Sequence, residues 1–303
     1  MKYFLLIICI ILTSICAVFA QDAEVVVNEE SGTAYKEGLK YYSEGKYDDS
    51  IRYFQKAYEL DDRNISALFA HGLALNKQGK YKGAAEKFGL TLDKDPGHTK
   101  ALRLYPSTLA RIDEDEKAIN AYDKSIATTP DDYYLYWGKA RVLIKLQKYD
   151  EAISQLKKSI EIDPKQETVY ETLAFVYRQQ KNIEDALSAY EKALELKPGD
   201  IKYMYYRAQT LSELGRMEDA YKAAIEILGK NQNHARARVI VADYKRLKGQ
   251  YQEALDDYNI AAKNIETKAY AEHFIGVINQ KLEEIEIEKE WETRQKQQQN
   301  SNQ

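Results

Sequence analysis

The side chains that usually perform catalysis or bind metals are few and far apart in this sequence. The four histidines lie in separate segments, at His71, His98, His234 and His273. None of them has a cysteine, a histidine or a carboxylate at the spacing of a metal site. The chain also lacks a phosphate-binding loop, a dinucleotide-binding fingerprint and the GxSxG turn of hydrolases. The sequence therefore predicts a protein without enzymatic activity, cofactor, metal or small-molecule substrate.

The remaining candidates are cationic and aromatic side chains, which often bind other macromolecules. The 303-residue chain has 44 Lys and Arg, 48 Asp and Glu, and 25 Tyr, so its formal net charge is -4. Proteins that bind nucleic acids are usually basic, and this balance argues against that class. With 30% charged and 44% hydrophobic residues, the composition is typical of a folded protein.

Residues 1–20 have the layout of a secretory signal peptide. Lys2 supplies a positive charge, an apolar run follows, and the small residues Val18 and Ala20 stand where a signal peptidase requires them. Both cysteines of the chain lie in this segment, so cleavage removes them. An uncleaved apolar run of this length could instead anchor the chain in a membrane. We expect an exported protein, periplasmic or secreted, that contacts a membrane only if the segment is retained.

The rest of the chain repeats one motif with a fixed period, which indicates a repeat architecture. Four copies align without gaps, and their first residues are 34 or 68 positions apart. They are the segments 45–61, 79–96, 147–164 and 181–198. Three further copies keep the same register, at 113–130, 215–228 and 249–263.

This pattern resembles the tetratricopeptide repeat family, whose units are pairs of antiparallel helices, here called A and B. The resemblance divides the chain into seven contiguous units: 31–64, 65–98, 99–132, 133–166, 167–200, 201–234 and 235–268. It implies an all-α fold, a right-handed superhelix of seven 34-residue helix-turn-helix units (31–268) with a capping helix at 269–296. We expect a flexible lead-in at 21–30 and a disordered tail at 297–303.

Small residues are expected where helix A crosses helix B, since they let the two backbones approach. These residues are Gly38, Gly72, Ala140, Ala174, Ala208 and Ala242. Large residues are expected on the buried face of helix B, at Phe54, Phe88, Tyr122, Leu156, Tyr190 and Tyr258. Glycines in the turns between A and B end helix A in a left-handed conformation, at Gly45, Gly79, Gly215 and Gly249. Pro106 occupies the crossing position of the third unit, where it predicts a kink or a late helix start. His71 is expected to be a packed core residue.

In the tetratricopeptide repeat family the concave face is lined mainly by helix A, and the resemblance places cationic and aromatic residues there. They are Lys100, Arg103, Arg111, Tyr134, Trp137, Arg141, Lys145, Phe175, Arg178, Lys202 and Tyr205. Arg and aromatic residues are frequent anchors of protein interfaces, and a basic surface attracts an acidic partner. The alternative is that the long cationic side chains are solvated and pair with neighbouring acids.

These features predict a scaffold or adaptor of the cell envelope that binds an acidic, extended or helical segment of another protein. The alternative is a constitutive structural subunit of an envelope assembly for outer-membrane biogenesis, secretion or motility, which would bind through helix B or the C-terminal helix. Some family members clamp acidic chaperone C-termini through an Asn at the ninth position of helix A. No unit of this chain has Asn there, so that clamp is not expected.

Overall fold

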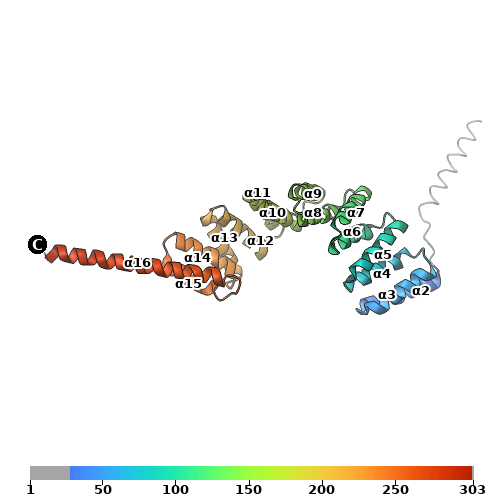
Figure 1. Cartoon of the computed structure of the whole chain (residues 1–303), viewed down its shortest axis with the longest axis horizontal. Helices are drawn as coiled ribbons and strands as arrows, with labels where there is room; N and C mark the ends of the chain where they lie inside the picture. Colours follow the sequence, from blue (N-terminus) through green and yellow to red (C-terminus); the bar gives the residue numbers. More distant parts are fainter. Residues whose placement is uncertain (1–27, 302–303) are drawn as a thin grey trace, which may run out of the picture. The chain divides into compact units, whose positions relative to one another are not determined.

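The computed structural model describes residues 28–301, and every regular element within this range is a helix (Figure 1). The all-α class is therefore confirmed, whereas the predicted signal peptide at 1–20 lies outside the described residues. The helices are α2 (Glu29–Ser43), α3 (Tyr47–Leu60), α4 (Ile65–Lys77), α5 (Tyr81–Lys94), α6 (Thr99–Arg111), α7 (Asp115–Thr128), α8 (Tyr133–Lys145), α9 (Tyr149–Ile162), α10 (Glu167–Gln179), α11 (Ile183–Leu196), α12 (Ile201–Glu213), α13 (Met217–Lys230), α14 (Ala235–Leu247), α15 (Tyr251–Ala261) and α16 (Lys268–Ser301).

The chain divides into two compact units, and the division falls within α8. Unit 1 ends at Val142 and unit 2 begins at Leu143. In unit 1, α2 packs on α3, α4 on α5 and α6 on α7; in unit 2, α10 packs on α11, α12 on α13 and α14 on α15. The second helix of each pair starts 34 residues after the second helix of the preceding pair, as the sequence repeat predicts.

The core of unit 1 is built around the large residue that each second helix buries. Phe54 and Phe88 are fully buried, and Tyr122 is 2% exposed. A Cβ atom added to Gly72 would lie 2.7 Å from the ring of Phe88, and one on Gly38 would lie 2.5 Å from the ring of Phe54. Both contacts are closer than packed carbon atoms tolerate. The crossing position of these two pairs therefore excludes any side chain as long as a phenylalanine ring stands opposite.

In unit 2 alanine stands at the crossing position and is completely buried, at Ala174, Ala208 and Ala242. The last pair is covered by α16, whose Ala271 and Ile278 are buried in one cluster with Tyr258 of α15. This helix runs to Ser301, so residues 297–301 are helical and the expectation of disorder there is wrong. Gln and Lys, which dominate the end of the chain, are good helix formers. At the other end, α2 begins at Glu29, inside the expected lead-in.

Pro106 lies inside α6, which is continuous from Thr99 to Arg111, so the expected late helix start is wrong. Because proline has no N–H group, the carbonyl four residues earlier, that of Leu102, loses its donor within the helix. The hydroxyl of Ser125 on α7 donates to this carbonyl in buried surroundings, with an O···O distance of 2.9 Å. The partner helix thus supplies the hydrogen bond that the proline removes.

We expect Ser125→Ala to lower the free energy of unfolding by about 1–2 kcal/mol, because the buried Leu102 carbonyl would lose its donor. In a Pro106→Ala background the restored amide can donate to the same carbonyl. In that background, Ser125→Ala should lower the free energy of unfolding by well under ~1 kcal/mol. Urea unfolding of the parent, the two single variants and the double variant measures the coupling between Pro106 and Ser125. Equal costs of Ser125→Ala in both backgrounds would show that the hydroxyl does not replace the lost amide.

The turns between paired helices use the left-handed conformation that the sequence predicts. The turn glycines have φ angles of 73° to 75°, at Gly45, Gly79, Gly215 and Gly249. The equivalent residues of the other pairs are not glycine, yet Asp113, Gln147 and Lys181 have φ of 59° to 60°. A residue with a Cβ atom costs about 1–2 kcal/mol in this conformation. The packing of the helix pairs therefore imposes the left-handed turn even where the turn residue is not glycine.

Candidate functional site

Four of the six predicted cationic and aromatic residues of unit 1 form a row along α6 and α8. The guanidinium of Arg103 lies 5.4 Å from the ring centroid of Tyr134, and the rings of Tyr134 and Trp137 are 5.4 Å apart. The guanidinium of Arg141 lies 4.9 Å from the ring centroid of Trp137. We call Arg103, Tyr134, Trp137 and Arg141 the stacked row. Exposed cation–π contacts contribute about 0.5–1 kcal/mol each, which favours one orientation of the two arginines.

Asp132 fixes one end of the stacked row. Its carboxylate accepts hydrogen bonds from Nε and Nη2 of Arg103, at 2.6 and 2.9 Å, and from the backbone N–H of Tyr134, at 3.0 Å. The hydrogen-bonded carboxylate raises the pKa of Arg103. Arg103 is thereby neutralised within the protein and orients its aromatic neighbour.

The other cations of the site in unit 1 have no such partner. Nη1 of Arg111 donates to the hydroxyl of Tyr81 at 3.2 Å, and its guanidinium lies 5.3 Å from the centroid of that ring. Lys100, in the first turn of α6, is exposed, as is Arg141. Within residues 28–142, no carboxylate forms an ion pair with any of these three cations. We call Lys100, Arg111, Arg141 and the rings of Tyr134 and Trp137 the cationic surface of unit 1. Its charges are available to carboxylates of a partner.

Two of the three cations predicted for unit 2, Arg178 and Lys202, are matched by carboxylates. Arg178 forms an ion pair with Glu213, and Nζ of Lys202 lies 2.7 Å from Oε2 of Glu171. The hydroxyl of Tyr203 donates to the same carboxylate of Glu171 at 3.1 Å. Here the structure corresponds to the alternative of the sequence analysis, in which long cationic side chains pair with neighbouring acids. Glu213 lies in the repeat that follows Arg178, and it neutralises that arginine. A count of the cations along helix A alone therefore overstates the net positive charge of these positions in unit 2.

The other predicted residues of unit 2 are spread over three helices. Lys145 is exposed in the last turn of α8. Phe175 on α10 is 46% exposed, which is unusual for a phenylalanine. The ring of Tyr205 on α12 lies 5.4 Å from that of His234, and the guanidinium of Arg236 lies 5.7 Å from the Tyr205 centroid. The predicted residues of unit 2 therefore combine aromatic side chains with cations, two of which are already paired with carboxylates.

A hydrogen-bond network that the sequence analysis did not identify joins α16 to the last helix pair. The carboxylate of Asp243 accepts from the hydroxyls of Tyr258, at 2.5 Å, and Tyr270, at 3.0 Å. Burial raises the pKa of Asp243, while these hydrogen bonds oppose the change. The guanidinium of Arg246 lies 4.3 Å from the ring centroid of Phe274 on α16. These contacts attach the first turns of α16 firmly to unit 2.

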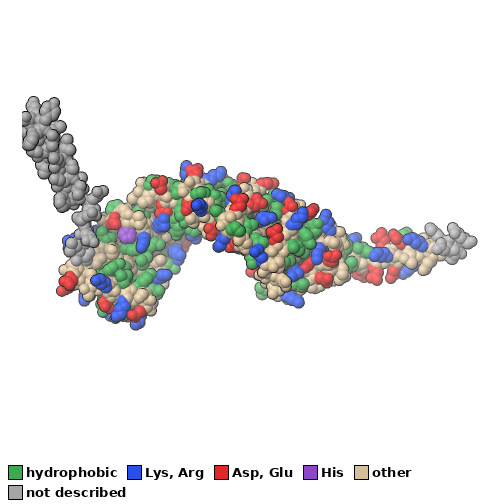
Figure 2. Space-filling view, turned by 180° about the vertical axis from the view of Figure 1, so that it is seen from behind, with side chains coloured by type: hydrophobic (Ala, Val, Ile, Leu, Met, Phe, Trp, Pro, Cys, Tyr) green, Lys and Arg blue, Asp and Glu red, His purple; other side chains and the backbone are tan. Residues whose placement is uncertain are grey.

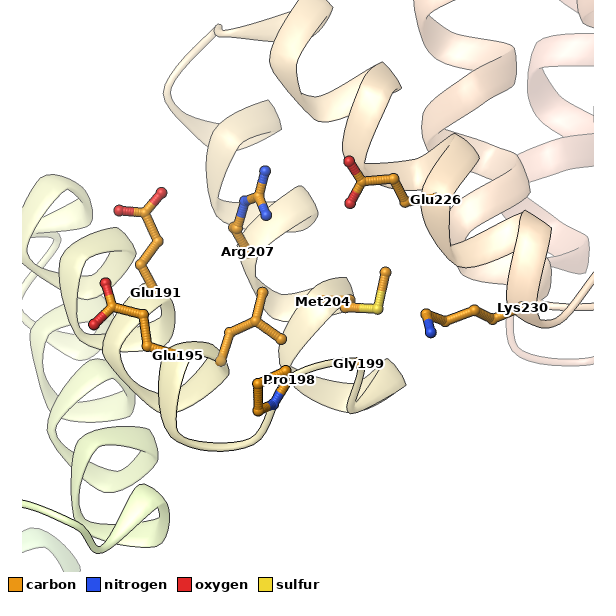
Figure 3. Close-up of a pocket in the computed structure, with 9 residues that line it drawn as sticks. Glu191, Glu195, Pro198, Gly199, Met204, Arg207, Glu226 and Lys230 are labelled. Carbon is orange, nitrogen blue, oxygen red and sulfur yellow. The ribbon is translucent and has the colours of Figure 1, made fainter.

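A depression of about 530 Å³ lies between α11, α12 and α13 (Figure 3). Figure 3 shows Arg207 between Glu191 on one side and Glu226 on the other. A depression of about 430 Å³ lies between α5, α6 and the turn after α6 in unit 1, and there Gly89 and Tyr105 stand at the repeat positions of Glu191 and Arg207. The two depressions overlap in repeat position but differ in their polar residues. We therefore assign them to the packing of successive repeats rather than to a dedicated ligand site.

Three of the four histidines have structural environments. Nδ1 of His98 accepts the backbone N–H of Ala101 at 3.2 Å, and Nδ1 of His234 accepts that of Ala237 at 3.1 Å, so both cap helices. His71 is 8% exposed, which confirms the expectation of a core residue. No group of His, Cys, Asp and Glu side chains in the described part of the chain could hold a metal ion. Between residues 28 and 301, no helix is both long and apolar enough to cross a bilayer.

Antiparallel helix pairs with a 34-residue period, small residues at the crossings and left-handed turns define a helical-repeat protein. Three family models described as tetratricopeptide repeat match the chain, at residues 35–99, 131–199 and 177–244. Together they cover more than half of it, and the chain belongs to the tetratricopeptide repeat family.

Solved structures share the fold at low sequence identity. A tetratricopeptide repeat protein from Parabacteroides merdae is 16% identical with a TM-score of 0.57, over 83% of this chain and 99% of that one. PilW, a type IV pilus biogenesis factor, is 19% identical with a TM-score of 0.56, over 68% and 96%. YrrB, described as having an unusual peptide-binding site, is 20% identical with a TM-score of 0.55, over 62% and 97%. The comparison with curated proteins found no match.

Proposed function

We propose that the protein is a non-enzymatic adaptor of the cell envelope that binds an acidic, extended or helical segment of another protein. The observation that carries the proposal is the cationic surface of unit 1. Its Arg111 and Arg141 are exposed, are held against aromatic rings and have no carboxylate partner in the described part of unit 1. Arginine held beside an aromatic ring combines charge, planar hydrogen bonding and apolar area, which favours it at protein interfaces.

Two further features support the proposal. The fold is that of a family whose members bind proteins, and YrrB is described as a peptide-binding member of this fold. The apolar residues 1–20, which have the layout of a signal peptide, support a place in the envelope.

The test compares two double variants. One carries Arg111→Glu and Arg141→Glu. The control carries Lys117→Glu and Lys192→Glu, which reverse the same number of charges on the second helices of two helix pairs. Both proteins and the parent chain, each starting at Gln21, are titrated into a labelled peptide of alternating Glu and Leu. We expect the first variant to bind at least about tenfold more weakly and the control to bind like the parent. Equal binding by all three proteins would exclude the cationic surface as the site.

The second candidate function is a constitutive subunit of an envelope assembly that binds through α16. The observation that favours it is the exposure of large apolar side chains on this helix, where Ile287 and Trp291 are each 61% exposed. PilW, which has a similar fold, is described as a pilus biogenesis factor. Affinity capture from an envelope extract separates the two functions. The adaptor loses its partner in the Arg111→Glu, Arg141→Glu variant, whereas the subunit loses it in Ile287→Ala, Trp291→Ala.

A further inference from the structure

Most of the second half of α16 is exposed to solvent. Ile278 is buried and Leu282 is packed against the cluster of the last helix pair, but every residue from Glu286 to Gln298 is exposed. Ile287 follows Ile278 by nine residues, or about two and a half helical turns, so it lies on the opposite face. Trp291 follows one turn later on the same face as Ile287. An isolated helical segment of this length is marginally stable in water.

The same part of α16 is strongly acidic. Residues 283–292 include six glutamates and one lysine. Glu284 pairs with Lys281 and Glu290 with Arg294. No ion pair in the described chain involves the other four, which are Glu283, Glu286, Glu288 and Glu292. Figure 2 shows acidic side chains on the exposed part of α16. An acidic helix with an Ile and a Trp on one face has the chemistry of the ligand proposed for the cationic surface of unit 1.

We propose that residues 283–298 of α16 from one copy of the protein dock on the cationic surface of unit 1 of a second copy. The proposal rests on the function given above and names its partner. The glutamates would pair with Lys100, Arg111 and Arg141. The side chains of Ile287 and Trp291 would pack on Tyr134 and Trp137, as anchor residues of a helix do in a groove.

Such a contact joins two different surfaces, so each copy retains one unoccupied surface of each kind. Contacts of this type continue from copy to copy and generate rings or open chains rather than a closed dimer. Association should therefore proceed beyond two copies as the concentration rises. Because ion pairs at the edge of the contact are screened, association should also weaken strongly between low and ~0.5 M salt.

Sedimentation velocity of the chain from Gln21 onward, over a series of concentrations at low salt, tests the proposal. We expect a mass that grows with concentration. Two double variants should each weaken association at least about tenfold. The first carries Glu286→Lys and Glu288→Lys, and the second carries Arg111→Glu and Arg141→Glu. Mixing these two variants should restore association between them, since each keeps one intact surface and the reversed charges oppose self-contact. Glu184→Lys, Glu191→Lys on α11 is the matched control and should behave like the parent.

A parent chain that stays monomeric at every concentration would overturn the proposal, and so would unchanged association in either variant. The Glu-Leu peptide of the preceding test distinguishes this failure from failure of the adaptor function. If the chain is monomeric but binds that peptide through Arg111 and Arg141, the surface binds an acidic partner other than α16. If it neither associates nor binds the peptide, both proposals fail.

Discussion

Phe88→Ala is expected to lower the free energy of unfolding by about 4 kcal/mol. The ring is fully buried in a cluster with Phe69, Ala84 and Ala101, and its centroid lies 5.5 Å from that of Phe69. Its neighbours belong to α4 of the same helix pair and to α6 of the next pair, so they cannot collapse into the cavity without separating the repeats. Guanidinium unfolding followed by circular dichroism measures the loss.

The control for this prediction is Gly72→Ala, which adds a methyl group 2.7 Å from the ring of Phe88. In the parent protein that substitution should cost about 1–3 kcal/mol through overpacking. In the Phe88→Ala background it fills part of the cavity, and we expect it to be neutral or stabilising. The same cost in both backgrounds would show that the penalty comes from the helix itself and not from the ring.

This pairing of a glycine with a ring explains why the repeat architecture could be predicted from the sequence. A side chain at the position opposite Phe88 costs stability, so small residues recur there with a period that can be read directly in the sequence. Pro106 could not be interpreted in the same way. Its effect depends on the hydroxyl of Ser125, which lies on another helix and would be an ordinary small residue if Pro106 were absent.

The electrostatics of the site were predictable only in part, for a related reason. Helix A positions indicated which cations lie on the predicted surface, and the structure brings Arg103 and Arg141 into one row with two aromatic rings. Whether a cation remains available to a partner depends on acids that are distant in the sequence. Arg103 is neutralised by Asp132, the last residue of its own unit, and Arg178 by Glu213 of the next unit. Pairings over such separations leave no periodic signal in one sequence.

At the end of the chain, a low-complexity composition rich in Gln predicts disorder, but the structure has a helix there. The residues of this segment have good helix propensity and continue a helix that unit 2 has already nucleated. Nucleation is the costly step, and the contacts of Tyr270 and Phe274 with Asp243 and Arg246 provide it. Propagation then adds one hydrogen bond for each residue, which extends α16 past its packed part.

Stability is expected to fall between pH 6.5 and pH 4 by about 2 kcal/mol because of His71 alone. Burial, together with the nearby Lys87 of α5, lowers the pKa of His71 to about 4, and Glu86 opposes this change only weakly. The folded protein therefore keeps the imidazole neutral while the unfolded chain takes up a proton below pH 6.5. The contribution is complete above that pH and is lost progressively as the pH falls toward 4.

His71→Leu tests this prediction because Leu173 occupies the equivalent position of α10 and is 7% exposed there, so the fold accommodates it. Acids and other histidines titrate in both proteins, so the measured quantity is the difference in unfolding free energy between parent and variant as a function of pH. We expect the variant to gain stability relative to the parent as the pH falls from 7 to 4. A difference that does not change with pH would mean that the protonated imidazole is accommodated in the folded core, through opening of the α4–α5 contact beside Lys87.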